Sequence, residues 1–265
     1  MVFTQSRWHD EWVPRIGMIV PSSNTTMETE VPALLRRRER ERAQDTFTFH
    51  SARVRMEHVT PEELRAMNAQ TKRATTELAD MRPDVVATVC LVAIMAQGPK
   101  HHCTVQAEIE SILEHEHAPA PAVSSAGALV DALHALGARR IGMVTPYLKE
   151  LTRLVVGYIE DAGIEVADTV SLEVSDNRAV AALDPEALKN HWRRLDLRDC
   201  DALVLSACVQ MPSLSVIEDV ERSSELPTLS AATATTWAIL RALDLEPVVP
   251  GAGALLGSAP ARIAH

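Results

Sequence analysis

One seven-residue motif occurs twice in the chain, and this repeat constrains the fold more than any other feature of the sequence. RIGMIVP at 15–21 returns as RIGMVTP at 140–146. Two unbroken apolar runs, 84–90 and 201–208, follow the two copies at nearly the same distance, and each run ends in a cysteine. Matched segments at matched spacing indicate an internal duplication in which each copy is one α/β unit.

Short apolar runs alternate with longer helical patterns along both copies. The two runs that end in cysteine have the uninterrupted hydrophobicity of parallel strands that are buried on both faces. Strands are predicted at 15–20, 47–54, 84–90, 121–126, 140–146, 164–174, 201–208 and 226–231, and helices at 28–42, 61–81, 104–117, 127–138, 147–162, 184–195, 213–223 and 232–245. The alternation predicts an α/β fold with two halves related by a pseudo-twofold axis, each with a mostly parallel sheet flanked by helices.

The duplication also suggests where the two halves begin and end. We expect residues 15–124, together with 231–250, to form the first half, and residues 125–230 to form the second. Residues 1–14 are expected to be an N-terminal extension, and 251–265 a peripheral tail without a role. Ligands of open parallel sheets bind at the carboxyl ends of the strands. We therefore expect the active site in the cleft between the halves, where both cysteine-terminated strands end.

Composition excludes several classes of partner. The 265 residues include 26 Lys and Arg against 36 Asp and Glu, which gives a net charge of −10, and only 3% are aromatic. An acidic surface repels phosphate groups, so we expect no nucleic-acid partner and no anionic membrane. No apolar run reaches the roughly 18 residues that span a bilayer, and the N-terminus lacks a signal-peptide core. The four scattered cysteines do not suit a disulfide framework, so we expect reduced thiols in the cytoplasm.

The sequence contains no motif for a metal or a nucleotide. HExxH, CxxC, GxGxxG and GxxxxGK[ST] are all absent. The densest histidine clusters, at 101–103 and 115–117, have spacings that point side chains apart on a helix. We expect neither a metal site nor a cofactor, so any chemistry depends on the side chains themselves.

Cys90 and Cys208 are the candidate catalytic residues, because they occupy matching positions in the two copies. Two thiols that face each other across a small molecule can act as nucleophile and acid, or as base and acid. A single cysteine in a strand is more often a small buried hydrophobe, and only the matched pair reverses that interpretation. Cys103 and Cys200 have no matching partner, and we interpret both as structural.

The surroundings of the two cysteines predict a site built from neutral hydrogen-bond donors. A catalytic thiolate needs donors or a helix N-terminus to lower its pKa, and neither following loop has a Lys, Arg or His beside its cysteine. Asn24 could donate to a carboxylate, or it could cap a helix. Tyr147 could be a donor or a buried phenol, and Asn177 could be a turn or cap residue.

Five motifs resemble the maleate cis-trans isomerases, a family within the aspartate/glutamate racemase superfamily. They are VPSSNTTMETEVPALL at 20–35, CLVAIMAQG at 90–98, TPY at 145–147, SDN at 175–177 and SACVQMPSL at 206–214. The resemblance extends from Arg15 to about Leu245. It implies a homodimer that isomerises maleate to fumarate without a cofactor.

The resemblance also implies a role for each candidate residue. Cys90 is expected to add to one alkene carbon, and Cys208 to protonate the other. The former double bond can then rotate before elimination releases the trans product. The two carboxylates are expected to bind the side chains of Asn24, Tyr147 and Asn177 and the backbone N–H groups of Leu91, Val92 and Val209.

Two alternatives remain at this stage. The first is another cofactor-independent enzyme of the superfamily. A racemase also uses two facing cysteines, but it should recognise an ammonium group, for which the motif loops offer no committed acid. A decarboxylase of the arylmalonate type would be expected to retain only one cysteine. The second is a non-catalytic dicarboxylate-binding protein, which would not need paired thiols.

Overall fold

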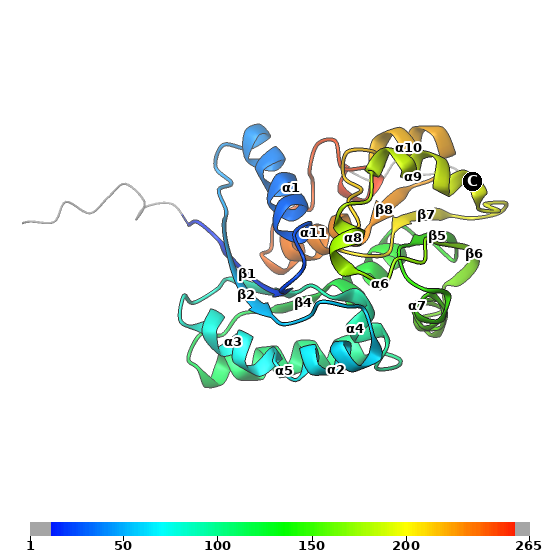
Figure 1. The fold of residues 1–265 in the computed structure, drawn as a ribbon. Helices are drawn as coiled ribbons and strands as arrows, with labels where there is room; N and C mark the ends of the chain where they lie inside the picture. The colour runs from blue at the N-terminus through cyan, green and yellow to red at the C-terminus, as the bar shows by residue number, and fades with distance from the viewer. Residues whose placement is uncertain (1–11, 258–265) are drawn as a thin grey trace, which may run out of the picture.

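The computed structural model describes residues 12–257 and contains two four-stranded sheets with equivalent strand orders (Figure 1). The first has the order β2-β1-β3-β4 and the second β6-β5-β7-β8, and all neighbouring strands run parallel. The strands are β1 (Arg15–Pro21), β2 (Thr48–Val54), β3 (Val85–Thr88), β4 (Ala122–Ser124), β5 (Arg140–Thr145), β6 (Glu165–Ser171), β7 (Ala202–Ser206) and β8 (Thr228–Ser230). The predicted fold of two parallel α/β halves is confirmed.

Helices cover both faces of each sheet. Figure 1 shows α1 and α11 above the first sheet and α3 and α5 below it, while α7 and α10 lie on opposite sides of the second. The helices are α1 (Met27–Glu41), α2 (Pro61–Asn68), α3 (Thr71–Ala79), α4 (Leu91–Met95), α5 (His101–His115), α6 (Ser125–Ala135), α7 (Lys149–Asp161), α8 (Asn177–Ala181), α9 (Pro185–His191), α10 (Ile217–Ser224) and α11 (Ala231–Ala242). Two 3₁₀ turns follow α9 and α11, η2 (Trp192–Arg194) and η3 (Ala254–Leu256).

Burial explains why the central strands read as continuous apolar runs. Every residue of β3 and of β7 is buried, because each strand lies inside its sheet with helices on both faces. The edge strand β6, by contrast, is mostly half-buried, and only one of its residues is fully buried. The hydrophobic core therefore runs through both halves and holds the carboxyl ends of β3 and β7 rigidly in place.

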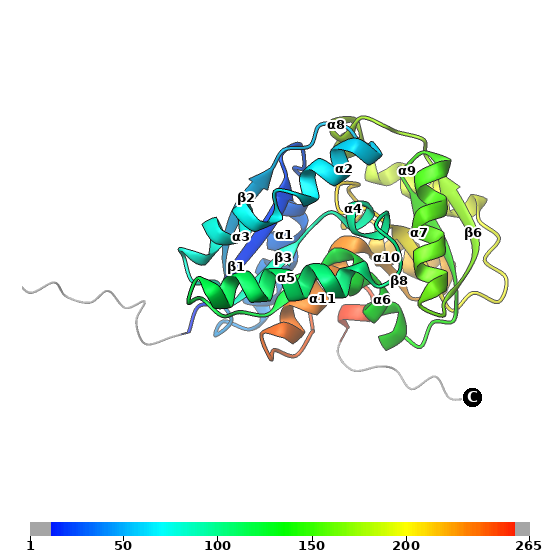
Figure 2. The same cartoon turned by 90° about the horizontal axis from the view of Figure 1, so that it is seen from below.

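The helix α11 joins the two halves. It packs against α6, α1 and β4. It also contacts β8 of the second sheet. Figure 2 shows the molecule from below, with α3 and α5 on the first sheet and α7 beside β6 of the second. The assignment of residues 231–250 to the first half stays a prediction. Of the predicted N-terminal extension, residues 1–11 lie outside the described residues.

The single helix predicted at 61–81 is wrong, because two helices form there. α2 ends at Asn68 and α3 begins at Thr71. The two helices pack against different partners, α2 on α4 and α3 on β2 and α5, so a straight helix could not satisfy both contacts. Gln70 stabilises the break by accepting a hydrogen bond from the backbone N–H of Arg55 at 3.3 Å.

The prediction that the C-terminal tail is peripheral is also wrong for residues 251–257. Leu256 is fully buried in the core, and its carbonyl accepts a hydrogen bond from Val249 at 2.8 Å. Glu221 accepts hydrogen bonds from the backbone N–H groups of Thr228 and Ala254, which ties the tail to β8. The apolar residues of this short segment were too few to show a periodicity.

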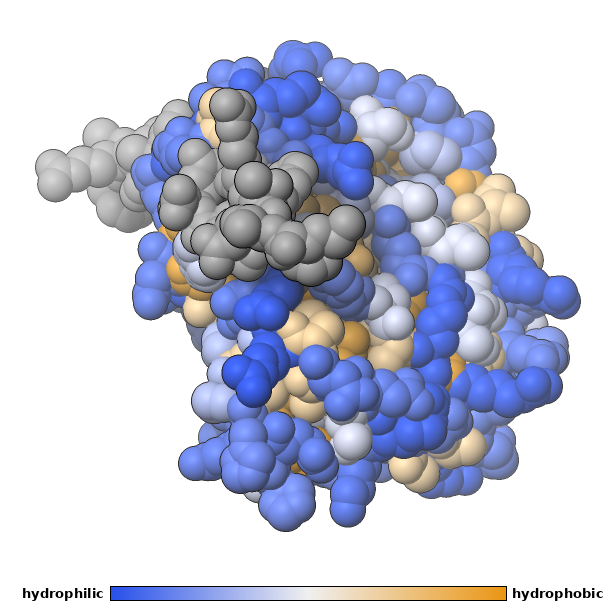
Figure 3. All heavy atoms as spheres, turned by 90° about the vertical axis from the view of Figure 1, so that its left-hand side faces the viewer, coloured by the Kyte–Doolittle hydropathy of each residue, from blue (hydrophilic) through white to orange (hydrophobic). Residues whose placement is uncertain are grey.

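The face in Figure 3 shows hydrophilic residues over most of its area, with hydrophobic residues in small groups between them. Within residues 12–257, no helix combines the length and the apolar composition that a membrane crossing requires.

We predict that Leu256→Ala lowers the free energy of unfolding by about 2–5 kcal/mol, because it leaves a cavity in the core. Leu154, which is 46% exposed, provides the matched control. Leu154→Ala should change stability by no more than about 0.5 kcal/mol. Urea unfolding followed by circular dichroism measures both variants. Equal effects of the two substitutions would contradict the assignment of Leu256 to the core.

Candidate active site

The two sheets bring their topological switch points together. In each sheet the chain order reverses beside the first strand, between β1 and β3 and between β5 and β7. Asn24 and Cys90 follow β1 and β3, and Tyr147 and Cys208 follow β5 and β7. Switch points of parallel sheets are where ligands bind. All four of these side chains line one small cavity.

The cavity is small and lined by uncharged side chains. None of its lining residues is a Lys, Arg, His, Asp or Glu; they are Pro21, Asn24, Met56, Val59, Val89, Cys90, Leu91, Val92, Tyr147, Asn177, Cys208, Val209 and Gln210. Every polar side chain among them is buried. All eight site residues predicted from the sequence therefore meet at one place. The charge of an anionic ligand would have to be balanced by neutral dipoles there.

Segments from both halves cover this cavity. His58 and Asp176 form an isolated antiparallel bridge, and the N–H of Val59 donates to the carbonyl of Ser175 at 3.4 Å. Met56 and Val59, which lie in this covering segment of the first half, supply the apolar part of the wall.

Cys90 lies at the N-terminus of the short helix α4, which was not among the predicted helices, and its pKa is not lowered there. Burial raises the pKa of the Cys90 thiol to about 12, against the opposing effect of a hydrogen bond from the backbone of Ala93. The nearby Cys208 raises it further. The expectation of a lowered pKa is wrong, because desolvation of the thiolate outweighs one backbone donor.

Cys208 has more donors around its sulfur. The backbone N–H of Gln210 lies 3.4 Å from Sγ, and hydrogen bonds from the phenol of Tyr147 and the backbone of Met211 also lower the pKa of Cys208. Burial is the larger effect and keeps this pKa above its ordinary value. Burial and the neighbouring Cys208 raise the pKa of Tyr147 well above its usual range, so its hydroxyl stays protonated and can donate.

Asn24 lies just before α1 and lines the cavity. Its Oδ1 accepts a hydrogen bond from the backbone N–H of Met27 at 2.9 Å, which satisfies the first N–H group of that helix, whereas the N-cap residue itself is Thr26. That contact fixes the amide plane at the cavity wall. Within residues 12–257 its Nδ2 makes no hydrogen bond, so this group is available as a donor in the cavity. Donation by Asn24 to a carboxylate stays a prediction.

Asn177 begins α8 and links the halves. Its Nδ2 donates to Ser23 Oγ at 2.8 Å, and Ser23 Oγ in turn donates to the carbonyl of Met56 at 2.5 Å. Asp176 caps α8 by accepting from Arg178 and Ala179. One amide hydrogen of Asn177 remains for a ligand in the cavity.

The three predicted backbone donors also lie at the cavity. Leu91 and Val92 occupy the first two positions of α4, where N–H groups have no partner within the helix. Val209 follows Cys208 in the equivalent loop of the second half. Together with the Asn and Tyr side chains, these groups form a set of neutral donors around the two thiols.

Comparison with known proteins identifies the family. The sequence model of the arylmalonate decarboxylase family matches residues 16–256. The maleate isomerase of Geobacillus stearothermophilus is 52% identical over 242 residues, which is 91% of this chain and 96% of that protein. The maleate isomerase of Pseudomonas putida KT2440 is 52% identical over 92% of this chain and 98% of that protein. The chain belongs to the maleate isomerase family.

Solved structures of the family have the same fold. The maleate isomerase of Pseudomonas putida S16, a Cys-to-Ala variant with maleate, superposes with a TM-score of 0.92 at 52% identity, and the match covers 94% of this chain and 99% of that one. A Cys-to-Ser mutant of the Nocardia farcinica maleate cis-trans isomerase superposes with a TM-score of 0.89 at 48% identity, over 92% and 98% of the two chains. That mutant carries a covalently bound succinylcysteine intermediate.

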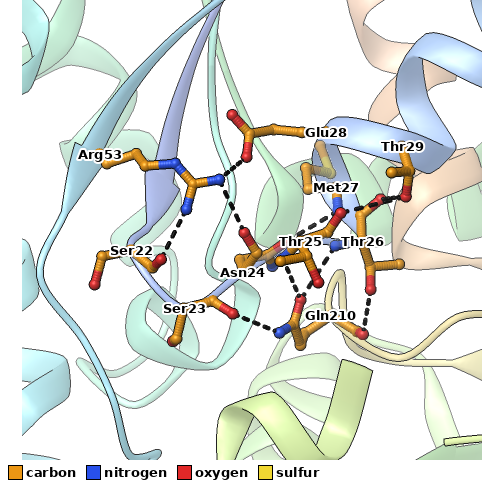
Figure 4. A network of polar contacts seen from close by, with 10 residues as sticks. All are labelled: Ser22, Ser23, Asn24, Thr25, Thr26, Met27, Glu28, Thr29, Arg53 and Gln210. Carbon is orange, nitrogen blue, oxygen red and sulfur yellow. Dashed lines mark hydrogen bonds and ion pairs between the residues drawn. The ribbon is translucent and has the colours of Figure 1, made fainter. Parts of the chain in front are cut away.

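Gln210 is the one polar residue of the cavity lining that was not predicted from the sequence. Figure 4 shows its side chain reaching from the loop after β7 into the turn between β1 and α1, where its carboxamide contacts residues 23–26. The signal available in the sequence was a neutral amide two residues beyond Cys208, in a loop without charges.

Cys103 and Cys200 do not line the cavity, which agrees with their exclusion from the chemistry. Cys200 is buried, whereas Cys103 is exposed on α5 and therefore contributes little to packing. Within residues 12–257, no group of three or more His, Cys, Asp or Glu side chains is arranged to hold a metal ion.

We predict that Cys90 reacts as a thiol of high pKa. In a Cys208→Ala variant, where burial still raises the pKa of Cys90, only the ionised fraction reacts with iodoacetamide. The alkylation rate should then rise about tenfold per pH unit between about pH 7 and 9. Peptide mass spectrometry separates this site from the other cysteines. A rate that levels off below about pH 8 would contradict the dominance of desolvation.

Proposed function

We propose that this protein isomerises maleate to fumarate by reversible covalent addition of a cysteine, without a cofactor. The observation that carries the proposal is the pair of buried thiols, one from each half, which share a small cavity lined only by neutral groups. Membership of the maleate isomerase family supports the same reaction. Cys90 is proposed as the nucleophile and Cys208 as the proton donor.

Binding uses the neutral donors of the cavity. The carboxylates of maleate accept hydrogen bonds from Asn24, Tyr147 and Asn177 and from the backbone N–H groups of Leu91, Val92 and Val209. Such preformed dipoles stabilise charge without reorganising during the reaction, and their effect is stronger where water is excluded. A dianion bound beside two thiolates would be repelled, so the reactive form of the pair carries a single negative charge. This form is a minor one because burial raises the pKa of both thiols, and its ionisation is a property of the pair.

The addition step moves that charge from one cysteine to the other. The Cys90 thiolate forms a bond to one alkene carbon, and the electron pair of the double bond shifts toward the second carbon and its carboxylate. Cys208 gives its proton to that second carbon and becomes the thiolate. The hydroxyl of Tyr147 and the N–H groups of Gln210 and Met211 stabilise the charge on Cys208. The high pKa of Cys90 makes its thiolate a strong nucleophile, although a rare one.

Elimination reverses the same steps after rotation. The bond between the two central carbons is single in the succinyl thioether, so the two carboxylates can turn away from one another. The Cys208 thiolate removes a proton from the carbon that it protonated, the double bond re-forms, and the bond to Cys90 breaks. The released product is fumarate, and the cysteine pair returns to its starting charge without any net oxidation or reduction.

A decarboxylase is the second candidate, because the matching family model bears that name and the arylmalonate decarboxylase of Bordetella bronchiseptica is 24% identical over 86% of this chain. The two cysteines favour isomerisation over this reaction. A racemase is disfavoured because no carboxylate lines the cavity to receive a substrate ammonium group. Release of carbon dioxide from an arylmalonate would support the decarboxylase.

We further propose that the protein acts in the cytoplasm as a homodimer. The chemistry needs reduced thiols, and all four cysteines are unpaired. The net charge of −10 supports a small-molecule substrate rather than nucleic acid as the partner.

We predict that Cys90→Ser lowers the turnover of maleate by at least about a thousandfold, because a hydroxyl is a far weaker nucleophile than a thiolate near neutral pH. Proton NMR of maleate and fumarate measures the conversion, and circular dichroism verifies the fold. Cys103→Ser is the matched control and should keep normal turnover. Near wild-type activity of Cys90→Ser, or an inactive Cys103→Ser, would contradict the assignment.

A further inference from the structure

The carboxamide of Gln210 is a buried junction between the two halves. Its Oε1 accepts from the backbone N–H groups of Thr25 at 3.0 Å and Thr26 at 3.3 Å. Its Nε2 donates to the carbonyls of Ser23 and Asn177, each at 2.9 Å. The side chain is only 1% exposed, so none of these contacts is replaced by water.

The three segments that meet at this amide all carry proposed site residues. Residues 23–26 include Asn24, the carbonyl of Asn177 belongs to a proposed ligand, and Gln210 itself follows Cys208 by two positions. The backbone of Gln210 adds two further contacts, because its carbonyl accepts from Thr26 Oγ1 at 2.8 Å and its N–H donates to Cys208 Sγ at 3.4 Å.

We propose that Gln210 is a positioning residue, which sets the distance between the carboxylate-binding groups Asn24 and Asn177 and the proton donor Cys208. This role rests on the proposed isomerase function. With four protein partners, the carboxamide has no hydrogen-bonding group left for maleate, so it acts through the segments that it joins. A small error in such spacing weakens binding and misplaces the reacting carbon relative to both thiols.

Only a carboxamide satisfies this arrangement. Two of the partners are backbone donors and two are backbone acceptors, so the side chain must present an acceptor on one side and a donor on the other. Because all four partners have fixed polarity, the orientation of the amide is determined as well. A glutamate would have the same shape, but its ionised carboxylate would place an oxygen against the carbonyls of Ser23 and Asn177.

The test compares two variants of Gln210 with wild type in a maleate assay that separates KM from kcat. Gln210→Met removes all four hydrogen bonds and should raise KM for maleate by about tenfold or more at every pH. Gln210→Glu should raise KM by a similar factor near pH 8. Its KM should fall back toward the wild-type value near pH 6, because a protonated carboxyl can donate to one of the two carbonyls.

Arg38→Met provides a control for simple loss of stability. Arg38 is also buried and joins distant segments, since it donates to the carbonyls of Glu246 and Val248 and pairs with Asp45, but it lies at the far end of α1 from Asn24. Thermal melts measure the stability of each variant. Arg38→Met should lower the melting temperature and leave the KM of the folded enzyme within about twofold of wild type.

The positioning role is overturned if folded Gln210→Met keeps the wild-type KM, or if Arg38→Met raises KM as much as Gln210→Met does. Where Gln210→Met does not fold, Gln210→Glu decides, and a wild-type KM near pH 8 overturns the role. Failure of the wild-type protein to convert maleate would refute the proposed function instead, and the parallel wild-type assay keeps the two results apart.

Discussion

Desolvation of the two thiols governs the chemistry of this cavity. A thiolate that leaves water for an uncharged site loses hydration, and here that loss raises the pKa of both Cys90 and Cys208. The site offers no cationic side chain in return. Hydrogen bonds from neutral groups are therefore the only means by which the protein can place a negative charge, and their distribution decides which sulfur carries it.

That distribution is unequal even though the two halves have the same topology. Cys90 accepts one hydrogen bond, from the backbone of Ala93. Cys208 accepts hydrogen bonds from the phenol of Tyr147 and from the backbone of Gln210 and Met211. Matching positions of the two halves carry the two thiols, and differences between the surrounding loops make the thiols unequal. A thiolate with few hydrogen bonds is the more reactive nucleophile. A thiol whose thiolate form is well stabilised is the stronger acid and gives up its proton more readily. The asymmetry thus fits addition by Cys90 and protonation by Cys208.

The same side chains serve the fold and the site. Asn24 satisfies the first N–H group of α1 with its oxygen and thereby fixes the amide that faces the cavity. Glu30 is buried and accepts the backbone N–H groups of Ser213 and Leu214, which anchors the loop after Cys208 to α1 of the other half. Burial raises the pKa of this Glu30 carboxyl. The cavity wall is consequently held by hydrogen bonds that cross from one half to the other.

The sequence predicted the parts of the structure that repeat or that follow a period. The repeated RIGM motif predicted β1 and β5 and the division into two sheets, and the unbroken apolar runs predicted β3 and β7 together with the cysteines that follow them. The break between α2 and α3 was missed because it depends on packing against α4 and β2, which leaves no trace in the local pattern.

Contacts between distant segments were equally invisible in the sequence. The carboxamide of Gln210 meets residues nearly two hundred positions away, and nothing local distinguishes it from a surface glutamine. The burial of Leu256 depends on the tail docking near β8. The raised pKa of Cys90 depends on how completely both halves exclude water, which composition does not reveal.

The central claim is that Cys90 bonds to the substrate and Cys208 moves the proton, and trapping the adduct tests it most directly. Intact-protein mass spectrometry of a Cys208→Ala variant after exposure to maleate should show a gain equal to one maleic acid, and digestion should map it to Cys90. The converse variant, Cys90→Ala, should gain nothing. An adduct on Cys208 in Cys90→Ala, with none on Cys90 in Cys208→Ala, would show that the two roles are reversed.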